Sequence, residues 1–396
     1  MLRVRSLFGF KIVLLLICIA ADSAASSDAD LEYLNSTLRD NFSNSRNHIS
    51  NAVYKQQSRD FIIAEFRRFE LEVEFHNFTS DVVGAGDFQN IIGVLRGKYF
   101  GTKKDQIVGV GAHYDTVIDT KGVDDNGSGI TALLYVAREI SKQRNREHTI
   151  MFLAFDVEEY DLTGSKVLLT DWLPVWSTTH WGNNQADFSP KGFIILDTIL
   201  EYESGQMTQD LPPGSTDILK FMFRDVYNSV TADNFTGDFL ASIYRSVSDG
   251  HLNTAFKESW DKLEQREFEI ETFALPFEDI ASIPESQLAF LANFGRSDHF
   301  NFWLAGIPAL FLTDTVNFRG NMTVCYHKPC DDLETMFKLE NLQFLGKTSL
   351  ALKETINALS PVLKDSSSGS AQDNKMCWTV LIICLFFAFK GFYNLC

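Results

Sequence analysis

The sequence predicts an α/β protein whose mostly parallel central sheet is covered on both faces. Short apolar runs recur along the chain, and residues 150–155 are apolar throughout, as expected of a strand buried on both faces. Residues 127–142 place apolar side chains at helical spacing between two such runs. Buried strands that alternate with amphipathic helices are typical of a parallel sheet between two helical layers.

The remaining elements follow the same pattern. We expect further strands at 91–95, 107–111, 193–196 and 308–312, a surface helix within 46–70 and a closing helix at 339–359. Residues 200–280 contain Pro212, Pro213 and many charges, and we interpret them as an irregular insertion that caps the domain. The folded domain is expected to span residues 26–365.

Composition indicates a folded, acidic protein. Of 396 residues, 45% are apolar, and 52 acidic side chains against 35 basic ones give a formal charge of −17. This charge argues against a nucleic-acid partner, since phosphates require a basic face. The sequence gives no indication of an oligomeric state.

Residues 1–25 have the parts of a secretory signal peptide. Arg3, Arg5 and Lys11 precede an apolar run at 12–21, and small residues follow it. The run is shorter than the ~20 residues that a membrane-spanning helix needs. We therefore expect export and removal of this segment.

Residues 366–396 resemble a GPI-attachment signal. Small residues come first, then a polar spacer, then an apolar stretch at 376–389 that Lys390 interrupts. A membrane-spanning tail is the alternative, although a span requires ~20 apolar residues. The expected location is extracellular: we expect the protein to be GPI-anchored at the cell surface, with the C-terminal anchor as its only membrane contact.

An oxidising compartment suits the cysteines and the glycosylation sequons. Cys325 and Cys330 are the cysteines that stay in the domain, and their short spacing predicts a disulfide. Glycosylation is expected at Asn35, Asn41, Asn77, Asn234 and Asn321. A further sequon, Asn126 to Ser128, lies in a motif expected to be buried and should stay unmodified.

Histidine and acidic side chains follow the ends of several expected strands. They are His113 and Asp115 after 107–111, Glu158 and Glu159 after 150–155, Asp197 after 193–196, and His327 beyond 308–312. Asp124 and Asp125 lie just before the helix at 127. The carboxyl ends of the strands border the functional crevice of such sheets, so these side chains are expected to meet. Imidazole and carboxylate suit Zn²⁺, and five ligands that share one carboxylate can hold two ions.

Motifs in this region, in order, resemble those of the M28 family of zinc peptidases. They are Gly111-Ala-His-Tyr-Asp-Thr116, Asp124-Asp-Asn-Gly-Ser-Gly129, Phe155-Asp-Val-Glu-Glu159 with Gly164 and Ser165, Leu196-Asp197, Ser297-Asp-His299 with Gly306-Ile-Pro308, and Tyr326-His327. The resemblance implies a phosphorylase/hydrolase-like three-layer sandwich of the zinc exopeptidase type. It also implies two Zn²⁺ ions per chain as cofactors.

By position, the resemblance makes Asp125 a carboxylate shared by both ions. His113 and Asp197 would complete one site, and Glu159 and His327 the other. Glu158 matches the family's general base, which would take a proton from a metal-bridged water.

Other residues receive supporting roles. Asp115 is expected to assist catalysis by accepting the second N–H of His113. Asp298, His299 and Tyr326 are expected to line the substrate pocket, with core packing an equal alternative for His299. A Cys325–Cys330 disulfide would stiffen the loop that contains His327. Two positions depart from the family pattern: Asp161 replaces a common Gly, and Thr198 a common Met.

The expected function is that of a zinc-dependent aminopeptidase acting on peptides. The alternatives are a glutaminyl cyclase-like acyltransferase, a carboxypeptidase and an inactive receptor-like member of the fold. Retention of all the ligands and of Glu158 argues against the inactive form.

Overall fold

The computed structural model describes residues 25–182, 188–278, 283 and 292–364. The expected C-terminal signal and residues 1–24 of the expected signal peptide lie outside these ranges. Within the described ranges, no helix has the length and apolar character needed to cross a membrane.

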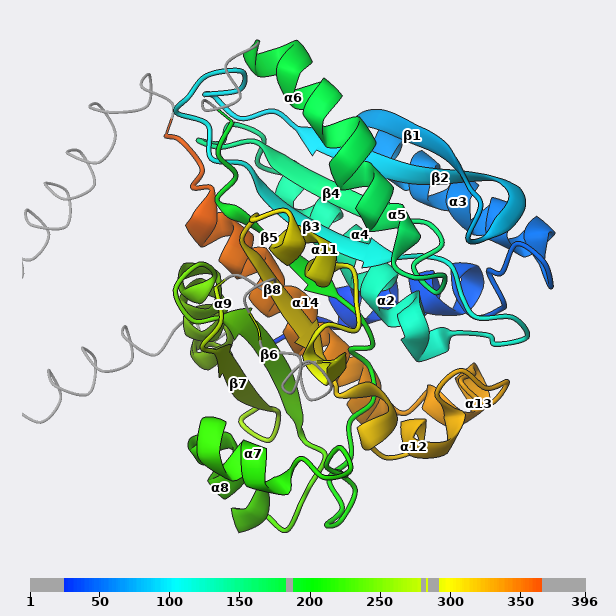
Figure 1. Ribbon diagram of the computed structural model, residues 1–396, viewed down its shortest axis with the longest axis vertical. Coiled ribbons are helices and arrows are strands. Elements are labelled where there is room, and N and C mark those ends of the chain that lie inside the picture. Colours follow the sequence, from blue (N-terminus) through cyan, green and yellow to red (C-terminus); the bar gives the residue numbers. More distant parts are fainter. Residues whose placement is uncertain (1–24, 183–187, 279–282, 284–291, 365–396) are drawn as a thin grey trace, which may run out of the picture.

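A mixed sheet of eight strands forms the centre of the molecule (Figure 1). The strands are β1 Glu72–Ser80, β2 Gly84–Leu95, β3 Val108–His113, β4 Ile150–Phe155, β5 Gly192–Leu196, β6 Phe239–Arg245, β7 Glu269–Leu275 and β8 Ala309–Thr313. Their spatial order is β1-β2-β4-β3-β5-β8-β6-β7. Strands β4, β3, β5 and β8 are mutually parallel, whereas β1, β2 and β6 pair antiparallel with their inner neighbours. The expected parallel centre is confirmed.

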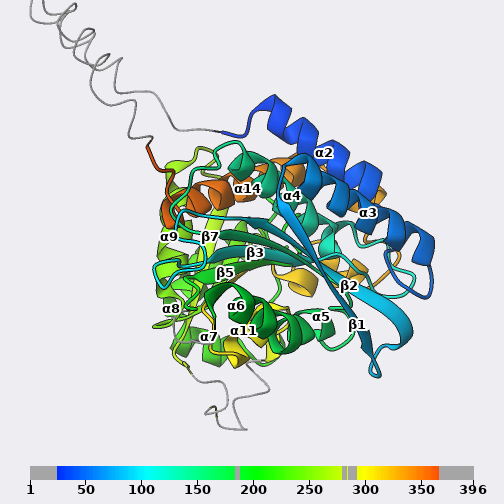
Figure 2. The same cartoon turned by 90° about the horizontal axis from the view of Figure 1, so that it is seen from above.

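Helices cover both faces of the sheet (Figure 2). One face is covered by α2 Asp28–Asn41, α3 Ala52–Arg68, α4 Gly129–Ser141, α9 Gly250–Lys262 and α14 Leu339–Leu359. The other face is covered by α5 Thr163–Val167, α6 Leu173–Trp181, α7 Thr216–Met222, α8 Arg224–Ala232 and α11 His299–Leu304. Each face has its own apolar core, so the three-layer sandwich is confirmed.

Short elements connect these layers at the carboxyl edge of the central strands. They are η1 Val123–Ser128, η5 Ala292–Phe294, η6 Val316–Phe318, α12 Met322–Cys325 and α13 Leu333–Met336, whereas η2 Leu168–Trp172 joins α5 to α6 within one helical layer. The expected helix at 127–142 is α4, which begins later because η1 forms a separate turn before it. That turn contains Asp124 and Asp125.

Two glycines let strand β3 pack closely against its neighbours. A Cβ on Gly109 would lie 2.1 Å from Cδ1 of Phe193, and one on Gly111 would lie 2.7 Å from Cε2 of Phe155. Both distances are far shorter than van der Waals contact, so larger residues would displace these aromatic rings. The glycines thereby let β3 run between β4 and β5 and deliver His113 to the edge of the sheet.

Residues 200–280 differ from the expected irregular cap. They form α7, α8 and α9 together with β6 and β7, which extend the central sheet. Strand β7 alternates exposed or half-buried residues with buried ones, as an edge strand does. Because charged residues such as Glu269 and Glu271 interrupt its apolar positions, β7 has no continuous apolar run by which the sequence could indicate it.

Arg46 connects the end of α2 to the loop that follows β3. Its side chain is fully buried. The guanidinium donates hydrogen bonds to the backbone oxygens of Tyr114, Gly122, Lys121, Phe42 and Asn44, at 2.7–3.1 Å. This one side chain therefore satisfies several carbonyls of the segment between His113 and Asp125.

Replacing Arg46 by Met should lower the free energy of unfolding by ~3 kcal/mol or more, because buried carbonyls lose their donors. Urea unfolding followed by circular dichroism measures the change. Arg67→Met removes an exposed arginine of α3 and should change stability by no more than ~0.5 kcal/mol. Equal effects of the two substitutions would contradict the role given to Arg46.

Candidate metal centre

The two histidines expected to bind metal lie on opposite sides of Asp125. Oδ1 of Asp125 is 3.5 Å from Nε2 of His113, and Oδ2 is 3.3 Å from Nε2 of His327. The Asp125 side chain is almost fully buried. One carboxylate thus presents a separate oxygen to each imidazole, which is the arrangement of a shared ligand.

Each imidazole is also close to a second carboxylate. His113 Nε2 lies 3.5 Å from Oδ1 of Asp197, and His327 Nε2 lies 3.2 Å from Oε2 of Glu159. Zinc bonds of ~2.0–2.2 Å at tetrahedral angles separate neighbouring ligand atoms by ~3.3–3.6 Å. The distances in both halves of the cluster therefore fit a divalent ion held by imidazole and carboxylate.

Buried imidazole nitrogens without partners support the same conclusion. Among the described residues, neither ring nitrogen of His113 nor Nε2 of His327 has a hydrogen-bond partner. Buried polar atoms rarely stay unpaired, because their desolvation is then uncompensated. A cation bound by these nitrogens would compensate it.

The cluster has an excess of negative charge that calls for cations. Burial raises the pKa of Glu159 to about 7 and that of Glu158 well above its ordinary value. Burial lowers the pKa of His327, but the nearby carboxylates of Asp125 and Glu159 outweigh it and raise this pKa to about 10. The carboxylates therefore favour positive charge at the imidazoles, which protons or a divalent ion can supply.

Asp115 supports the two glutamates more directly than it supports His113. Its carboxylate accepts hydrogen bonds from the backbone N–H groups of Glu158, at 3.0 Å, and Glu159, at 3.3 Å. Oδ1 is 3.4 Å from Nδ1 of His113, but that nitrogen makes no hydrogen bond. The carboxylate therefore fixes the backbone of the Glu-Glu pair, and its expected bond to the imidazole of His113 stays a prediction.

Asp331 has a similar role that the sequence analysis missed. Its two carboxylate oxygens accept hydrogen bonds from the backbone N–H groups of Asp124, at 2.8 Å, and Asp125, at 3.0 Å. The residue is fully buried and directly follows Cys330. An acidic residue beside the predicted disulfide was the only available signal.

Asn126 joins η1 to the end of β5. Its Nδ2 donates to the backbone oxygen of Leu196 at 2.8 Å, and its Oδ1 accepts from the N–H groups of Gly129 and Thr198. The side chain is fully buried, as expected for a sequon that stays unmodified. These bonds hold Asp125 and Asp197 near each other.

The other sequons differ in exposure. Asn77 and Asn234 are exposed, whereas Asn35, Asn41 and Asn321 are half-buried. Nδ2 of Asn321 donates to Oε1 of Glu201 at 3.0 Å, so this acceptor is already engaged. Glycosylation stays a prediction at all of them.

Left-handed backbone conformations adjoin the candidate ligands. Val157 has a φ of 50°, Thr198 of 48° and His327 of 57°. Asp161, which replaces a glycine common in the M28 family, has a φ of 60°. Glycine adopts this conformation without strain, and aspartate tolerates it better than most residues. Such strained positions concentrate at functional sites.

The expected disulfide is present. Cys325 and Cys330 are bonded, and the loop between them contains His327. Tyr326 stacks on His327, with 3.7 Å between the ring centroids. The loop therefore fixes both the backbone and one ring face of the imidazole.

Of the three expected pocket residues, Tyr326 faces the site, and His299 and Asp298 are fully buried. His299 is fully buried; it stacks on Phe311 at 4.2 Å, and its Nε2 lies 2.7 Å from the backbone oxygen of Phe294. Asp298 is also fully buried and lines neither hollow beside the metal ligands. His299 thus takes the packing position that was its equal alternative, and the pocket role of Asp298, whose charge interacts with those of His113 and Asp197, stays a prediction.

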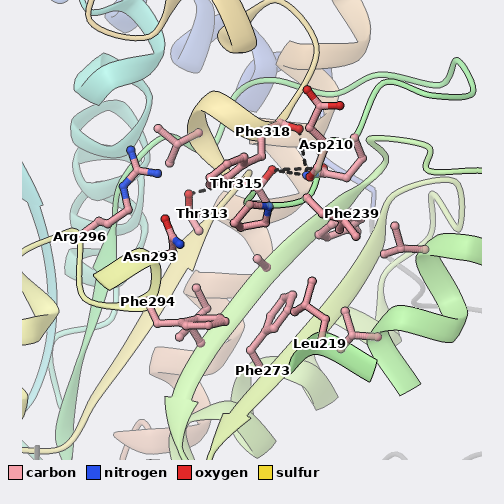
Figure 3. A pocket seen from close by; sticks show the side chains of 18 of the residues that line it. Asp210, Leu219, Phe239, Phe273, Asn293, Phe294, Arg296, Thr313, Thr315 and Phe318 are labelled. Carbon is pink, nitrogen blue, oxygen red and sulfur yellow. Dashed lines mark hydrogen bonds between the residues drawn. The ribbon is translucent and has the colours of Figure 1, made fainter. Parts of the chain in front are cut away.

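Two hollows adjoin the candidate ligands. The first, here called the metal cleft, has a volume of about 490 Å³ and is bordered by acidic residues that include Asp125, Glu158 and Glu159. The second, here called the apolar cavity, encloses about 100 Å³ between β6, β7, β8 and helices α7 and α8 (Figure 3). Asp197 and Tyr326 line both.

Comparison with known proteins gives consistent matches. The sequence pattern of Peptidase family M28 matches residues 90–261 and 246–352. Aminopeptidase YwaD of Bacillus subtilis is 44% identical over 77 residues, which are 19% of this chain and 16% of that protein. Aminopeptidase Y of Saccharomyces cerevisiae is 24% identical over 239 residues, 59% of this chain and 33% of that one. The chain thus spans a third or less of either relative.

A solved structure confirms the fold. The structure of BSAP, a zinc aminopeptidase from Bacillus subtilis, matches with a TM-score of 0.55 at 15% identity, over 89% of this chain and 100% of that one. The family match and the aminopeptidase relatives identify a metallopeptidase, an enzyme of the hydrolase class. The chain belongs to Peptidase family M28.

Reduction of the Cys325–Cys330 disulfide should lower zinc affinity, because it frees the loop that positions His327. We expect a Cys325→Ser/Cys330→Ser variant to bind zinc about 10-fold or more weakly, the range seen when groups that orient ligands are lost. Competition with a chromophoric chelator measures the affinity. An unchanged affinity would show that the disulfide does not position the ligand.

Proposed function

We propose that the protein is a zinc-dependent aminopeptidase that binds two zinc ions. The observation that supports this proposal best is the position of Asp125, whose two oxygens face two different imidazoles. In the proposal Asp125 is shared, His113 and Asp197 complete one site, and Glu159 and His327 complete the other.

Glu158 is proposed as the general base. It is almost fully buried at the metal cleft, and its Oε2 lies 3.8 Å from Nε2 of His113. Bound zinc would lower the pKa of a coordinated water and polarise the peptide carbonyl. Glu158 would accept the proton of the attacking water and return it to the leaving amine. The hydrogen bond from its own N–H to Asp115 holds this residue in place.

The charge of the metal cleft supports removal of residues from unblocked amino termini. Acidic side chains line it, and Asp161 adds one that is not a proposed ligand. An excess of carboxylates attracts the ammonium group of a free amino terminus. A glutaminyl cyclase-like acyltransferase, working at one zinc, would not need both halves of the cluster, and an inactive receptor would not need Glu158.

We also propose that the mature protein is secreted and GPI-anchored at the cell surface. The Cys325–Cys330 disulfide supports an oxidising compartment. The signals at the two ends, residues 1–25 and 366–396, supply the route and the anchor in this proposal.

Glu158→Gln should lower kcat by ~10²–10⁴-fold, the usual contribution of a general base, while the zinc content stays at two ions per chain. Hydrolysis of aminoacyl-arylamides and elemental analysis of the purified protein measure the two quantities. Asp161→Asn changes a cleft carboxylate without removing a proposed ligand and should retain most of the activity. Chelator should abolish the wild-type activity.

Other outcomes of the same assay would contradict the proposal. Ring closure of a glutaminyl peptide without hydrolysis would identify a cyclase. Cleavage restricted to N-blocked peptides would identify a carboxypeptidase. One zinc per chain would refute the shared role of Asp125, and two zincs without any turnover would indicate an inactive member.

The proposed GPI anchor leads to a separate prediction. A phosphatidylinositol-specific phospholipase should release the full-length protein from the surface of expressing cells, because a GPI anchor attaches only through its lipid. Western blotting of the supernatant measures release, and a version ending at residue 365 should appear in the medium without the enzyme. Retention of the full-length protein after treatment would indicate a membrane-spanning tail.

A further inference from the structure

The apolar cavity and the metal cleft share a short wall. Leu219, Val226, Phe239, Phe273 and Phe294 supply much of the cavity's apolar lining. An apolar cavity of roughly 150 Å³ accommodates benzene, so the 100 Å³ here suits a side chain such as that of leucine. Three residues line both hollows, namely Asp197, Tyr326 and Arg296.

Arg296 places a positive charge in this wall. Figure 3 shows it at one edge of the cavity, with Phe239 and Leu219 at the opposite edge. Its Nη1 donates to Oδ1 of Asn317 at 2.7 Å, and its guanidinium carbon lies 5.1 Å from the centre of the Tyr326 ring. In the described part of the chain, no carboxylate forms an ion pair with it.

This lack of an acidic partner is informative in a chain with 52 acidic residues. Arg245, by contrast, forms a buried ion pair with Asp249. A guanidinium has five N–H donors and binds carboxylates through two parallel hydrogen bonds. The donors of Arg296 that do not bond Asn317 are therefore suited to a carboxylate of a ligand.

The distances allow that ligand to be a peptide cleaved at the metal centre. Tyr326 stacks on His327, a proposed metal-binding residue, with 3.7 Å between the ring centroids. Together with the contact between Arg296 and Tyr326, this places the guanidinium no more than about 9 Å from the imidazole, a separation close to the length of two residues of ~3.8 Å each. A residue whose side chain enters the cavity would have its backbone beside Arg296.

Resting on the proposed peptidase function, we infer that Arg296 and the apolar cavity recognise the residue on the carboxyl side of the scissile bond. The cavity takes its apolar side chain, and Arg296 binds its free terminal carboxylate. The preferred substrates are then dipeptides that end in an apolar residue. For a dipeptide, removal of the first residue and of the last is the same reaction, so the inference is compatible with an aminopeptidase.

The test compares alanyl-leucine with alanyl-leucine amide on the zinc-loaded protein. We expect kcat/KM to be about 10- to 100-fold higher for the free acid, because the amide cannot accept the paired hydrogen bonds. Arg296→Gln should remove this preference mainly through a higher KM for the acid, and Arg296→Lys should restore part of it. Lys166→Gln removes another positive charge of the metal cleft and should leave the preference unchanged.

A second arm tests the cavity. Ala241 lines it from β6, so Ala241→Leu should lower kcat/KM for alanyl-leucine and change that for alanyl-alanine much less. A preference for alanyl-aspartate amide over alanyl-asparagine amide would place a side-chain carboxylate on Arg296 and overturn the assignment to the terminal carboxylate.

The two proposals fail in different ways. Equal cleavage of alanyl-leucine and its amide by the wild type overturns this inference alone, and it needs no variant to fold. Equal loss of both activities in Arg296→Gln also overturns it. No cleavage of any unblocked peptide, the amide included, overturns the proposed function and this inference together.

Discussion

The burial of several carboxylates around Asp125 is the constraint on which the rest of this structure depends. Transfer of a charge out of water is costly unless hydrogen bonds and opposite charges compensate for it. Here the compensation comes from three sources, which are backbone N–H groups, the imidazoles of His113 and His327, and the cations that the cluster can bind. Arg46 adds a buried positive charge on the far side of the loop, close to Asp115 and Asp125.

The backbone bonds of the cluster explain why the surrounding loops have fixed shapes. Asp115 bonds the N–H groups of the Glu-Glu pair, and Asp331 bonds those of the Asp-Asp pair. Each of these two carboxylates thus fixes a segment that lies elsewhere in the chain and contains a proposed metal ligand. The ends of β3 and β4 and the disulfide loop are held to one another in this way, and the metal site needs no large rearrangement to form.

Local patterns made the central strands and the ligands predictable. Continuous apolar runs mark β3, β4 and β5, and each ends in the histidine or acid that parallel strands bring to a common edge. The edge strand β7 has alternating charges, so no such run marks it. Arg46, Asp331 and Arg296 were not predictable, because their roles arise from contacts between segments far apart in the chain. For His299 the motif match left a pocket role and core packing equally open, and the stacking of its ring on Phe311 is a core contact that the motif alone does not indicate.

The buried sequon at Asn126 has a consequence for how the protein is made. In the export route proposed above, oligosaccharide would be transferred to chains that are still unfolded, and Asn126 is followed by glycine and serine, as an acceptor requires. In the folded protein its Nδ2 bonds Leu196 and no part of the side chain reaches solvent. A sugar at this position would have to lie inside the sheet edge, so the native fold leaves no room for the modification. Folding of η1 onto β5 would then compete in time with glycan transfer, and the yield of active protein would depend on which is faster.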